Sequence, residues 1–567
     1  MFGEVSSPKM KPKDTWTKRI NLILLNRLEE RITHLVKVRR FPEAKKVAEK
    51  AERVATETFG PNHARVLTYQ SNLASITKLI SVSENDIVPI NSVQDVQPEI
   101  SHRAKAINWA AFIRVAVPLI FVITLSVVFI NQLATSTPKK TQPIYVTNSL
   151  QNNIVPIYRV KAEFFPNRRT IEGEEEVFFD NKDSRNEMVF NLFFNRYKNA
   201  RLNSSEIRRY AFQHGIDTGY INVLWVSYKG NRVPFKKAGE TLRINLNNGM
   251  FLSGGDSLKI GFKVKIPYIP DRSGGNDHGI WLGNWLPTLN VDSSQHQSTE
   301  IGDPFVNIAS TYDVTLTTPK EYNLVMSDIQ GIINQDSKKI FKGTLENVRD
   351  LPIFLNRDYK EAVSTQGNTE IHYYYNSPNN RAVEVLDIAA KAVAYYKDKF
   401  GEYPWKQLNI VENDMYLSGM EYSTLFLISE RAIGKNLEET VFHEVGHQWF
   451  YNIVGSDQYR SAFIDEGLVE FITYYVLERN VPRNYVGIEV LNKDLGQFTS
   501  WQQYRDIHYH NGRKLFENLY VAMGKTEFEK FIKEYYDRYK YSLVSQEEFK
   551  RFLTEIAGVQ LTDKLLQ

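Results

Sequence analysis

The sequence predicts a multidomain α+β protein in which a helical segment and one membrane-spanning helix precede a β-rich domain and a mostly helical domain. Three patterns predict this organisation. Residues 107–133 form an apolar run that is long enough to cross about 30 Å of hydrocarbon as a helix. Residues 156–365 contain short alternating or β-branched runs bounded by turn residues, which is typical of strands. In residues 366–567, apolar positions mostly recur at helical spacing.

The composition is that of a large folded protein with few options for a metal site. The chain has 567 residues, of which 42% are hydrophobic and 13% aromatic, so it can build several large cores. Cysteine is absent, which excludes disulfides and thiolate ligands, so a zinc site must use histidine and carboxylate side chains. Residues 1–105 hold 18 Lys/Arg and 12 Asp/Glu, a local net charge of +6. This basic segment lacks interleaved aromatic residues, so it indicates the cytoplasmic side of a membrane and no nucleic-acid partner.

Residues 1–80 are predicted to form a small helical segment. Ala and Val recur at helical spacing in residues 40–55, and a Phe-Gly-Pro-Asn-His stretch interrupts the pattern before it resumes at 64–76. This resembles one helix pair of a tetratricopeptide repeat, which implies docking of a cytoplasmic peptide or protein partner. A single repeat cannot bury its own faces, and a small helical bundle without a partner is an equal alternative. Residues 81–106 form a polar linker.

Residues 107–133 are expected to be a single membrane anchor. Residues 1–17 are polar and rich in lysine, so the sequence predicts no N-terminal signal peptide. Basic residues are more frequent before the apolar run than after it, which places the N-terminus in the cytoplasm and the later domains outside it. A buried core helix is the alternative for this run. Residues 134–155 are polar and would tether the outer part to the membrane.

The β-rich domain is predicted to be a sandwich or saddle of long strands. Residues 174–179, 258–266 and 312–317 show the strand pattern most clearly. Residues 273–278 and 281–287 lie between such runs. Ordinary loop and core structure is the preferred interpretation of these two stretches, and a role in lining a cleft is the alternative.

The mostly helical domain begins with a long amphipathic helix over residues 382–400. Residues 408–412 and 425–428 are then predicted to be two edge strands that flank Glu421. After residue 436 the sequence predicts helices only.

Within this domain, His443, Glu444 and His447 form an H-E-x-x-H sequence, and Glu466 follows after eighteen intervening residues. Residues four apart lie on one face of a helix, so both imidazoles can bind the same metal ion. Two histidines and one glutamate leave the fourth position of a tetrahedral Zn²⁺ open for water, which is what a catalytic site requires. We therefore predict one Zn²⁺ per chain, with Glu444 as the base that takes a proton from that water.

The residues around this motif are apolar, which argues against two unrelated histidines on a surface helix. Residues 440–450 and 463–472 are rich in large apolar side chains, so both stretches are predicted to be buried helices. Buried ionisable groups need partners, and a metal ion supplies one. Asp465, beside Glu466, could orient that ligand or cap its helix, and the pattern fits both roles.

These residues resemble the gluzincin aminopeptidase family, the type that includes aminopeptidase N and leukotriene hydrolase. Three more stretches are similar to motifs of that family and occur in the same order. Residues 400–405 are similar to F-G-x-Y-P-Y, residues 418–422 to G-x-M-E-N, and residues 509–512 to Y-x-K-G. The resemblance extends over residues 155–555.

The resemblance implies a thermolysin-like zinc peptidase domain and roles for four further residues. Glu421, with Gly419 and Met420, would bind the free α-amine of a peptide substrate. Tyr509 would stabilise the oxyanion. The alternative for Glu421 is an exposed carboxylate at the end of a strand.

The sequence departs from the family at Tyr422, where the family has Asn, and at Asn511, where it has Lys. The first departure leaves removal of N-terminal residues and internal cleavage both open. The second leaves the implied role of Tyr509 intact. His508 and His510, beside Tyr509, are expected at the surface or behind the ligands, not on the metal.

The sequence therefore predicts a membrane-anchored zinc metallopeptidase that acts on peptides outside the cytoplasm, with aminopeptidase activity favoured. One alternative is a receptor or scaffold that binds peptides without turnover and signals through its cytoplasmic helices. Another is a zinc hydrolase with a non-peptide substrate. Intact Glu444 and Tyr509 argue against the receptor, because a protein without turnover needs neither residue.

Overall fold

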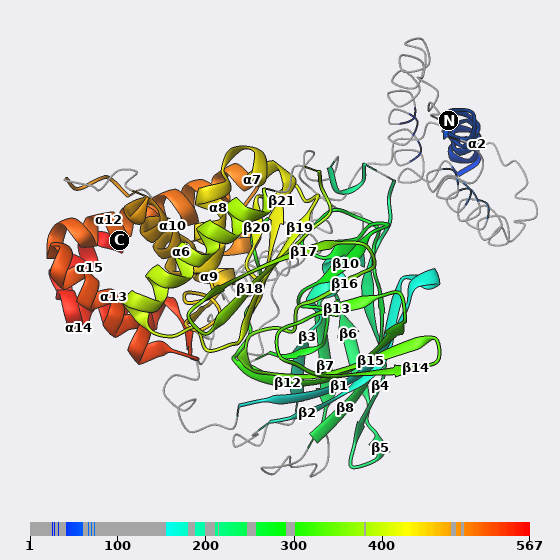
Figure 1. The fold of residues 1–567 in the computed structure, drawn as a ribbon, viewed down its shortest axis with the longest axis horizontal. Helices are drawn as coiled ribbons and strands as arrows, with labels where there is room; N and C mark the ends of the chain where they lie inside the picture. Colours follow the sequence, from blue (N-terminus) through cyan, green and yellow to red (C-terminus); the bar gives the residue numbers. More distant parts are fainter. Residues whose placement is uncertain are drawn as a thin grey trace, which may run out of the picture. The chain divides into compact units, whose positions relative to one another are not determined.

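The computed structural model describes residues 41–59 and most of the chain from residue 155 to residue 566 (Figure 1). A few single positions near the first helix are also described, namely Leu25, Leu28, Ile32, Val66, Gln70, Leu73 and Thr77. The gaps beyond residue 155 are 180–186, 199–209, 214, 247–256, 291–300, 379–380, 478–483, 489–490 and 492. The chain divides into two compact units, residues 1–144 and residues 145–567, which are described separately.

The first unit contains helix α2 (Phe41–Phe59) at the position that the sequence predicts. Alanines at helical spacing form its buried face, and this face contacts apolar side chains from helical positions on both sides of it in the sequence. The contacting residues are Ala51 and Ala55 with Leu25, Leu28 and Val66. Burial of small residues along one stripe lets neighbouring helices approach closely. A helical segment is thus present, and the tetratricopeptide resemblance and its partner remain predictions.

The predicted membrane anchor, residues 107–133, lies outside the described residues, as do the linker and nearly all of the tether. Among the helices that the structure describes, none combines the length and apolar character needed to cross a membrane. The anchor therefore remains a prediction from the sequence.

The second unit begins with an eight-stranded sheet in the order β14-β15-β12-β1-β2-β8-β4-β5. Its strands are β1 (Ile157–Phe165), β2 (Thr170–Phe178), β4 (Tyr220–Tyr228), β5 (Asn231–Arg232), β8 (Ser257–Lys265), β12 (Ser310–Pro319), β14 (Ile329–Gln335) and β15 (Lys338–Val348). Strands β1 and β12 are parallel and the other pairs are antiparallel. The three strand runs that the sequence shows most clearly lie in β2, β8 and β12, so those predictions are confirmed.

Two four-stranded sheets complete the β-rich domain. One has the order β13 (Asn323–Val325), β16 (Ile353–Asn356), β10 (Gly279–Leu282) and β9 (Gly274–Gly275). The other has the order β11 (Thr288–Leu289), β3 (Glu187–Asn191), β7 (Thr241–Asn245) and β6 (Phe235–Ala238). Trp281 and Trp285 are fully buried, which confirms that residues 281–287 are core structure.

A five-stranded sheet connects the β-rich domain to the helices, with the order β17-β18-β19-β21-β20 (Figure 1). Its strands are β17 (Lys360–Gln366), β18 (Thr369–Tyr375), β19 (Gln407–Asn413), β20 (Gly419–Met420) and β21 (Leu425–Ser429). The prediction that β19 and β21 are edge strands is wrong. Both are parallel and almost wholly buried, and continuous apolar runs of this kind belong in a sheet interior. Strand β20, which precedes Glu421, forms the edge instead.

The pairing of β18 with β19 places the β17–β18 hairpin in this sheet. Strand β17, which starts at Lys360, thus pairs within the same sheet as the strands that flank Glu421.

The helical part consists of α6 (Ala382–Phe400), α7 (Glu430–Lys435), α8 (Leu437–Gly446), α9 (Gln458–Ser461), α10 (Glu466–Val476), α11 (Trp501–Tyr504), the π-helix η6 (Arg505–Asn511), α12 (Gly512–Met523), α13 (Lys525–Tyr539), α14 (Gln546–Ala557) and α15 (Val559–Leu565). Short 3₁₀ turns occur at η2 (Pro166–Arg168), η3 (Phe193–Lys198), η4 (Ala462–Ile464) and η5 (Leu495–Gln497). The prediction of helices alone after residue 436 is wrong, because β22 (Gly455–Ser456) pairs with β23 (Leu543–Val544). These strands tie the turn after α8 to the C-terminal helices.

Arg349, at the end of β15, joins the β-rich domain to the turn that follows α8. It is fully buried, and its guanidinium donates to the backbone carbonyls of Tyr451, Asn307, Ile453 and Ser542. Burial lowers the pKa of Arg349 to about 10, so it stays charged at neutral pH. A guanidinium group has five N–H donors and can therefore bind several carbonyls at once. This one side chain thus connects the segments around residues 307, 451–453 and 542 near the candidate site.

Candidate metal centre

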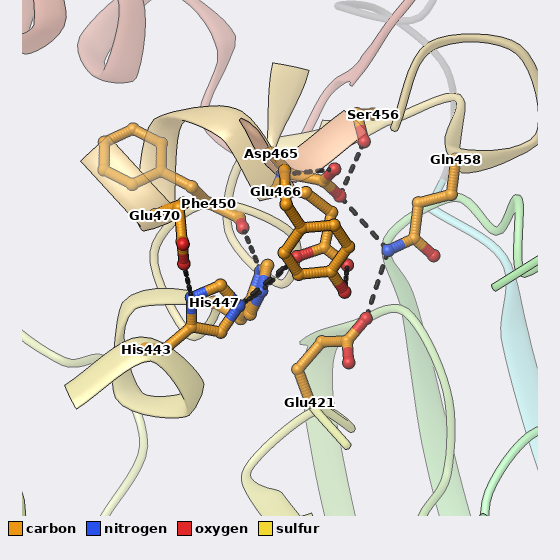
Figure 2. A network of polar contacts seen from close by, with 10 residues as sticks. Glu421, His443, His447, Phe450, Ser456, Gln458, Asp465, Glu466 and Glu470 are labelled. Atoms are coloured by element: carbon orange, nitrogen blue, oxygen red, sulfur yellow. Dashed lines mark hydrogen bonds and ion pairs between the residues drawn. The ribbon is translucent and has the colours of Figure 1, made fainter. Parts of the chain in front are cut away.

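Helix α8 positions both histidines of the H-E-x-x-H sequence toward helix α10 (Figure 2). It packs against α6 and α10 through buried apolar residues. His443 lies in the last turn and His447 is the residue that caps the C-terminus, so the helix ends at the motif instead of continuing to residue 450 as predicted. The two imidazoles still face the same way, with ring centroids 4.6 Å apart.

Three potential ligand atoms converge at this place. His443 Nε2 and His447 Nε2 are 2.9 Å apart, and Glu466 Oε2 lies 3.3 Å from the first and 3.1 Å from the second. Bonds of about 2.0–2.1 Å at tetrahedral angles would place such atoms about 3.3 Å apart. The three donors thus fit a zinc ion in number, chemistry and separation.

The outer ring nitrogens of both histidines have acceptors of their own. His447 Nδ1 is 3.0 Å from the carbonyl of Phe450, and His443 Nδ1 is 3.4 Å from Glu470 Oε2. An acceptor at Nδ1 keeps the proton there and leaves Nε2 free to bind a metal. The sequence interpretation missed Glu470, although its place four residues after Glu466 on one helix face could have indicated it.

Glu466 is the first residue of α10, and the sequence prediction of a helix through 463–472 is therefore correct only from this residue on. Burial raises the pKa of its carboxyl, but the neighbouring His447 and His443 outweigh this and hold the pKa well below its usual range. Glu466 is thus ionised, as a metal ligand must be.

Glu444 lies beside the three ligand atoms and is 6% exposed. Its Oε1 is so close to Gly419 that a Cβ atom on residue 419 would lie 1.9 Å away. Its Oε2 is buried and has no hydrogen-bond partner among the described residues. Burial raises the pKa of Glu444 to about 7, and a cation at the ligands would act in the opposite direction. Glu444 thus has one oxygen free to exchange a proton.

Tyr509 reaches the same place from the π-helix η6. Its hydroxyl donates to Glu466 Oε1 at 2.6 Å, and its ring stacks on His443 at 5.9 Å between centroids. One extra residue per turn in a π-helix redirects a side chain, and such turns recur at functional sites. Burial raises the pKa of Tyr509 well above its usual value, so the hydroxyl is a neutral donor.

The two neighbouring histidines do not reach the ligand atoms. His510 is exposed beside Asp506. His508 is fully buried against the rings of Tyr504 and Phe498, so a surface position for it is wrong. Burial lowers its pKa to about 4, so His508 is a neutral packing residue.

Glu421 directly follows strand β20 and is 5% exposed, so the alternative of an exposed strand-end carboxylate is wrong. Ligand oxygens of Asp303, Glu421 and Glu466 all lie within 4.8 Å of one another. Asp303 comes from the β-rich domain, where it forms a buried ion pair with Arg272, and no local sequence pattern indicated it. Gln458 Nε2 donates to Glu421 Oε1 at 3.1 Å. We call Asp303, Glu421 and Gln458 the acidic end of the site.

Arg272 and Gln458 already donate to carboxylates of the acidic end. This arrangement suits a substrate cation that makes hydrogen bonds better than it suits a second metal ion, which would compete with those donors.

Tyr422, the residue that departs from the family motif, points away from the metal centre. Its hydroxyl donates to the carbonyl of Arg272 at 2.9 Å, and its ring occupies the space beside Gly283. Its own carbonyl accepts from Gln448 Nε2 at 3.1 Å, and Gln448 Oε1 accepts from the backbone N–H of Thr424. Gln448 directly follows His447, so these two hydrogen bonds connect the segment after Glu421 to the end of helix α8.

Residues 384–500 match the family model described as the Peptidase family M1 domain. This segment includes the three potential ligands, Glu444 and Glu421, and it ends before Tyr509.

Among curated proteins, the chain is similar to Aminopeptidase M1-C of Oryza sativa subsp. japonica, at 24% identity over 238 residues that cover 36% of this chain and 27% of the rice protein. It is also similar to the Alanine/arginine aminopeptidase of Saccharomyces cerevisiae, at 20% identity over 400 residues that cover 61% of this chain and 46% of the yeast protein. The chain thus spans less than half the length of these relatives.

Among solved structures, the M1 zinc metallopeptidase from Deinococcus radiodurans matches with a TM-score of 0.54 and 14% identity, over 73% of this chain and 93% of that protein. A mutant of that protein bound to a Tyr-Ser-Ala substrate matches with a TM-score of 0.51 over the same shares of both chains. The greater part of this chain therefore has the fold of these M1 zinc metallopeptidase structures.

Proposed function

We propose that this chain is a zinc metallopeptidase that removes N-terminal residues from peptides. One observation carries the proposal. Three ligand atoms, a buried carboxylate with one oxygen that has no partner among the described residues, and a separate acidic end meet in one site. The match of residues 384–500 to the M1 peptidase domain supports the same function.

The acidic end would bind the substrate's α-ammonium. Glu421 is buried, so its carboxylate acts on a bound cation with little screening by water. Asp303 adds negative charge from the β-rich domain, and its ion pair with Arg272 offsets part of that charge. A free N-terminus held here lies beside the metal centre, which selects the first peptide bonds for cleavage.

Zinc bound by His443, His447 and Glu466 would polarise the scissile carbonyl and lower the pKa of water toward about 7. Glu444 takes a proton from the attacking water through its unpartnered oxygen and delivers it to the leaving amine. Tyr509 exchanges its hydrogen bond to Glu466 for one to the carbonyl oxygen as negative charge develops there.

Matched peptides test the function directly. The full chain, purified in detergent, is incubated with a free-amine peptide and with its N-acetylated counterpart, and zinc is measured by elemental analysis. We expect one zinc per chain, release of the first residue from the free peptide and little cleavage of the blocked one. Equal cleavage of both would indicate an endopeptidase, and zinc binding without cleavage of either would support a receptor or a non-peptide substrate.

The metal ligands have a separate test. His447→Ala should lose the zinc, because it removes one of three ligand atoms that lie within 3.3 Å of one another. A variant that keeps a full complement of zinc would contradict this assignment.

We also propose that residues 107–133 anchor the protein in a membrane, with the N-terminus in the cytoplasm and the peptidase outside. The length of the apolar run and the basic residues before it support this topology. Protease added to intact cells should then remove the peptidase domain and spare an N-terminal tag. Digestion of the tag first would reverse the orientation.

A further inference from the structure

Gln458 occupies a buried position between Glu421 and Asp465, the residue just before the helix that carries Glu466 (Figure 2). It is the first residue of the short helix α9 and is 1% exposed. Asp457, just before it, accepts from the backbone N–H groups of Tyr459 and Arg460 and so fixes the start of α9. The backbone therefore presents the Gln458 side chain from a defined place.

The amide nitrogen of Gln458 serves two carboxylates at once. Nε2 donates to Glu421 Oε1 and to Asp465 Oδ2, both at 3.1 Å. Oε1 is buried and has no hydrogen-bond partner among the described residues. When both neighbouring carboxyl groups are ionised, only this orientation of the amide provides two hydrogen bonds.

Asp465 continues the connection to the metal centre. Its Oδ1 accepts from the backbone N–H of Glu466 at 2.8 Å, and its Oδ2 accepts from Ser456 Oγ at 2.7 Å. Asp465 thus both caps helix α10 and holds Gln458. A continuous set of hydrogen bonds runs from the Glu421 carboxylate through Gln458 and Asp465 to the backbone of Glu466.

We propose that Gln458 is a positioning residue that fixes the Glu421 carboxylate for a substrate ammonium and couples it to the metal ligand Glu466. This inference rests on the proposed aminopeptidase function. The oxygens of Glu421 lie within 4.8 Å of those of Asp303 and Glu466, so these like charges repel one another. A neutral donor held by Asp465 keeps Glu421 in place without a positive charge that would oppose the ammonium.

The test measures binding instead of turnover. Calorimetry gives the dissociation constants of L-tryptophan and N-acetyl-L-tryptophan for the zinc-loaded full chain and for its Gln458→Met variant. Met is similar in size to Gln but cannot donate. We expect L-tryptophan to bind about tenfold to a hundredfold more weakly to the variant, because a hydrogen bond to a charged group is lost. N-acetyl-L-tryptophan, which has no ammonium, should bind both proteins equally.

A second variant, Asp465→Asn, leaves Gln458 in place and changes the carboxylate that holds its amide. In Asp465→Asn, the oxygen stays with the Glu466 N–H, so the new NH₂ group faces the Gln458 amide. Gln458 must then rotate and present Oε1 to Glu421, which again weakens L-tryptophan binding. In a double-mutant cycle, Asp465→Asn should add little to Gln458→Met, because both changes remove the same hydrogen bond.

Gln502→Met is the matched control. Gln502 is exposed, and its amide also donates to a carboxylate, that of Asp506 at 2.8 Å. This control should keep wild-type binding, and zinc content and melting temperature are measured for every variant. If folded, zinc-loaded Gln458→Met or Asp465→Asn binds L-tryptophan as the wild type does, the positioning role is wrong. If the wild type itself does not distinguish the two ligands, the amine-binding function fails, and this inference fails with it.

Discussion

The metal centre and the acidic end of the site meet at Glu466, yet the fold builds them in different ways. The metal centre takes its ligands from α8 and α10, which lie close together in the sequence. The acidic end takes Asp303 from the β-rich domain, Glu421 from the edge of the five-stranded sheet and Gln458 from the short helix α9. The first depends on local spacing, and the second depends on how two domains pack.

This difference separates the chemistry from the choice of substrate. Local spacing places both histidines on one face of α8, and α10, which carries Glu466, packs directly against that helix. The acidic end depends on contacts between distant residues, of which the Arg272–Asp303 ion pair and the Tyr422 hydroxyl bond to Arg272 are examples. Changes at the metal centre should therefore affect turnover, and changes at the acidic end should affect the recognition of the N-terminus.

The largest expected effect concerns Glu444. Glu444→Gln removes the group that takes the proton from water and returns it to the leaving amine, so turnover should fall about 10²–10⁴-fold. Zinc content and substrate affinity should be unchanged, because Glu444 is neither among the three ligand atoms nor in the acidic end. Steady-state kinetics with parallel zinc analysis measures both. Loss of zinc in this variant would contradict the separation of roles.

The next effect concerns Tyr509. Tyr509→Phe removes one donor to the developing oxyanion, for which a loss of about 10²–10³-fold in turnover is typical. The KM should change little, because this hydrogen bond matters most in the transition state. Undiminished turnover would mean that another hydroxyl fills the role. Tyr504, whose buried hydroxyl has no partner among the described residues, could then do so, whereas the Tyr422 hydroxyl is held by Arg272.

The sequence was sufficient to find the metal centre because its information is local. Spacing along a helix placed both histidines on one face, and apolar neighbours indicated that they are buried. The same reasoning located strands β2, β8 and β12 and helix α6. It went wrong for β19 and β21, because their continuous apolar runs are typical of interior parallel strands and not of the edge strands that were predicted.

The acidic end could not be found in this way, because no spacing rule links Asp303 to Glu421 or Gln458. Asp303 lies in another domain, and Gln458 begins the short helix α9, which directly follows strand β22 of the β22–β23 pair. Only Glu421 was identified, through its resemblance to a family motif. The close approach of Gly419 to Glu444 was equally hidden, because it depends on an edge strand passing over a helix.

That close approach joins the two parts of the site, and Gly419→Ala tests the connection. A Cβ atom at residue 419 would overlap Glu444 Oε1, so the carboxylate must move. Displacing a catalytic group by about 1 Å can reduce the rate about 10²-fold, so we expect a loss of that size with zinc retained. Gly434→Ala in α7 is the control, because no atom of the part of the chain that the structure describes lies within 4 Å of its added Cβ. Full activity of Gly419→Ala would show that Glu444 has room to shift without consequence.

The smallest effect is expected for a substitution of Asp303, which should weaken the binding of the substrate's N-terminus and leave turnover nearly unchanged. Asp303→Asn removes one negative charge from the acidic end and breaks the Arg272–Asp303 ion pair, so both changes disfavour a bound ammonium. The KM for free-amine peptides should rise about tenfold, equivalent to about 1.4 kcal/mol, while turnover changes little.

The matched control for Asp303 is Asp358→Asn. Asp358 pairs with His278 at the surface, 2.9 Å apart, where an ion pair contributes little. Breaking a buried ion pair also lowers stability, so the kinetics are measured well below the melting temperature of each variant. An unchanged KM in folded Asp303→Asn would mean that this carboxylate serves only to anchor Arg272. The acidic end would then consist of Glu421 and its Gln458 support, and recognition of the N-terminus would depend on the second domain alone.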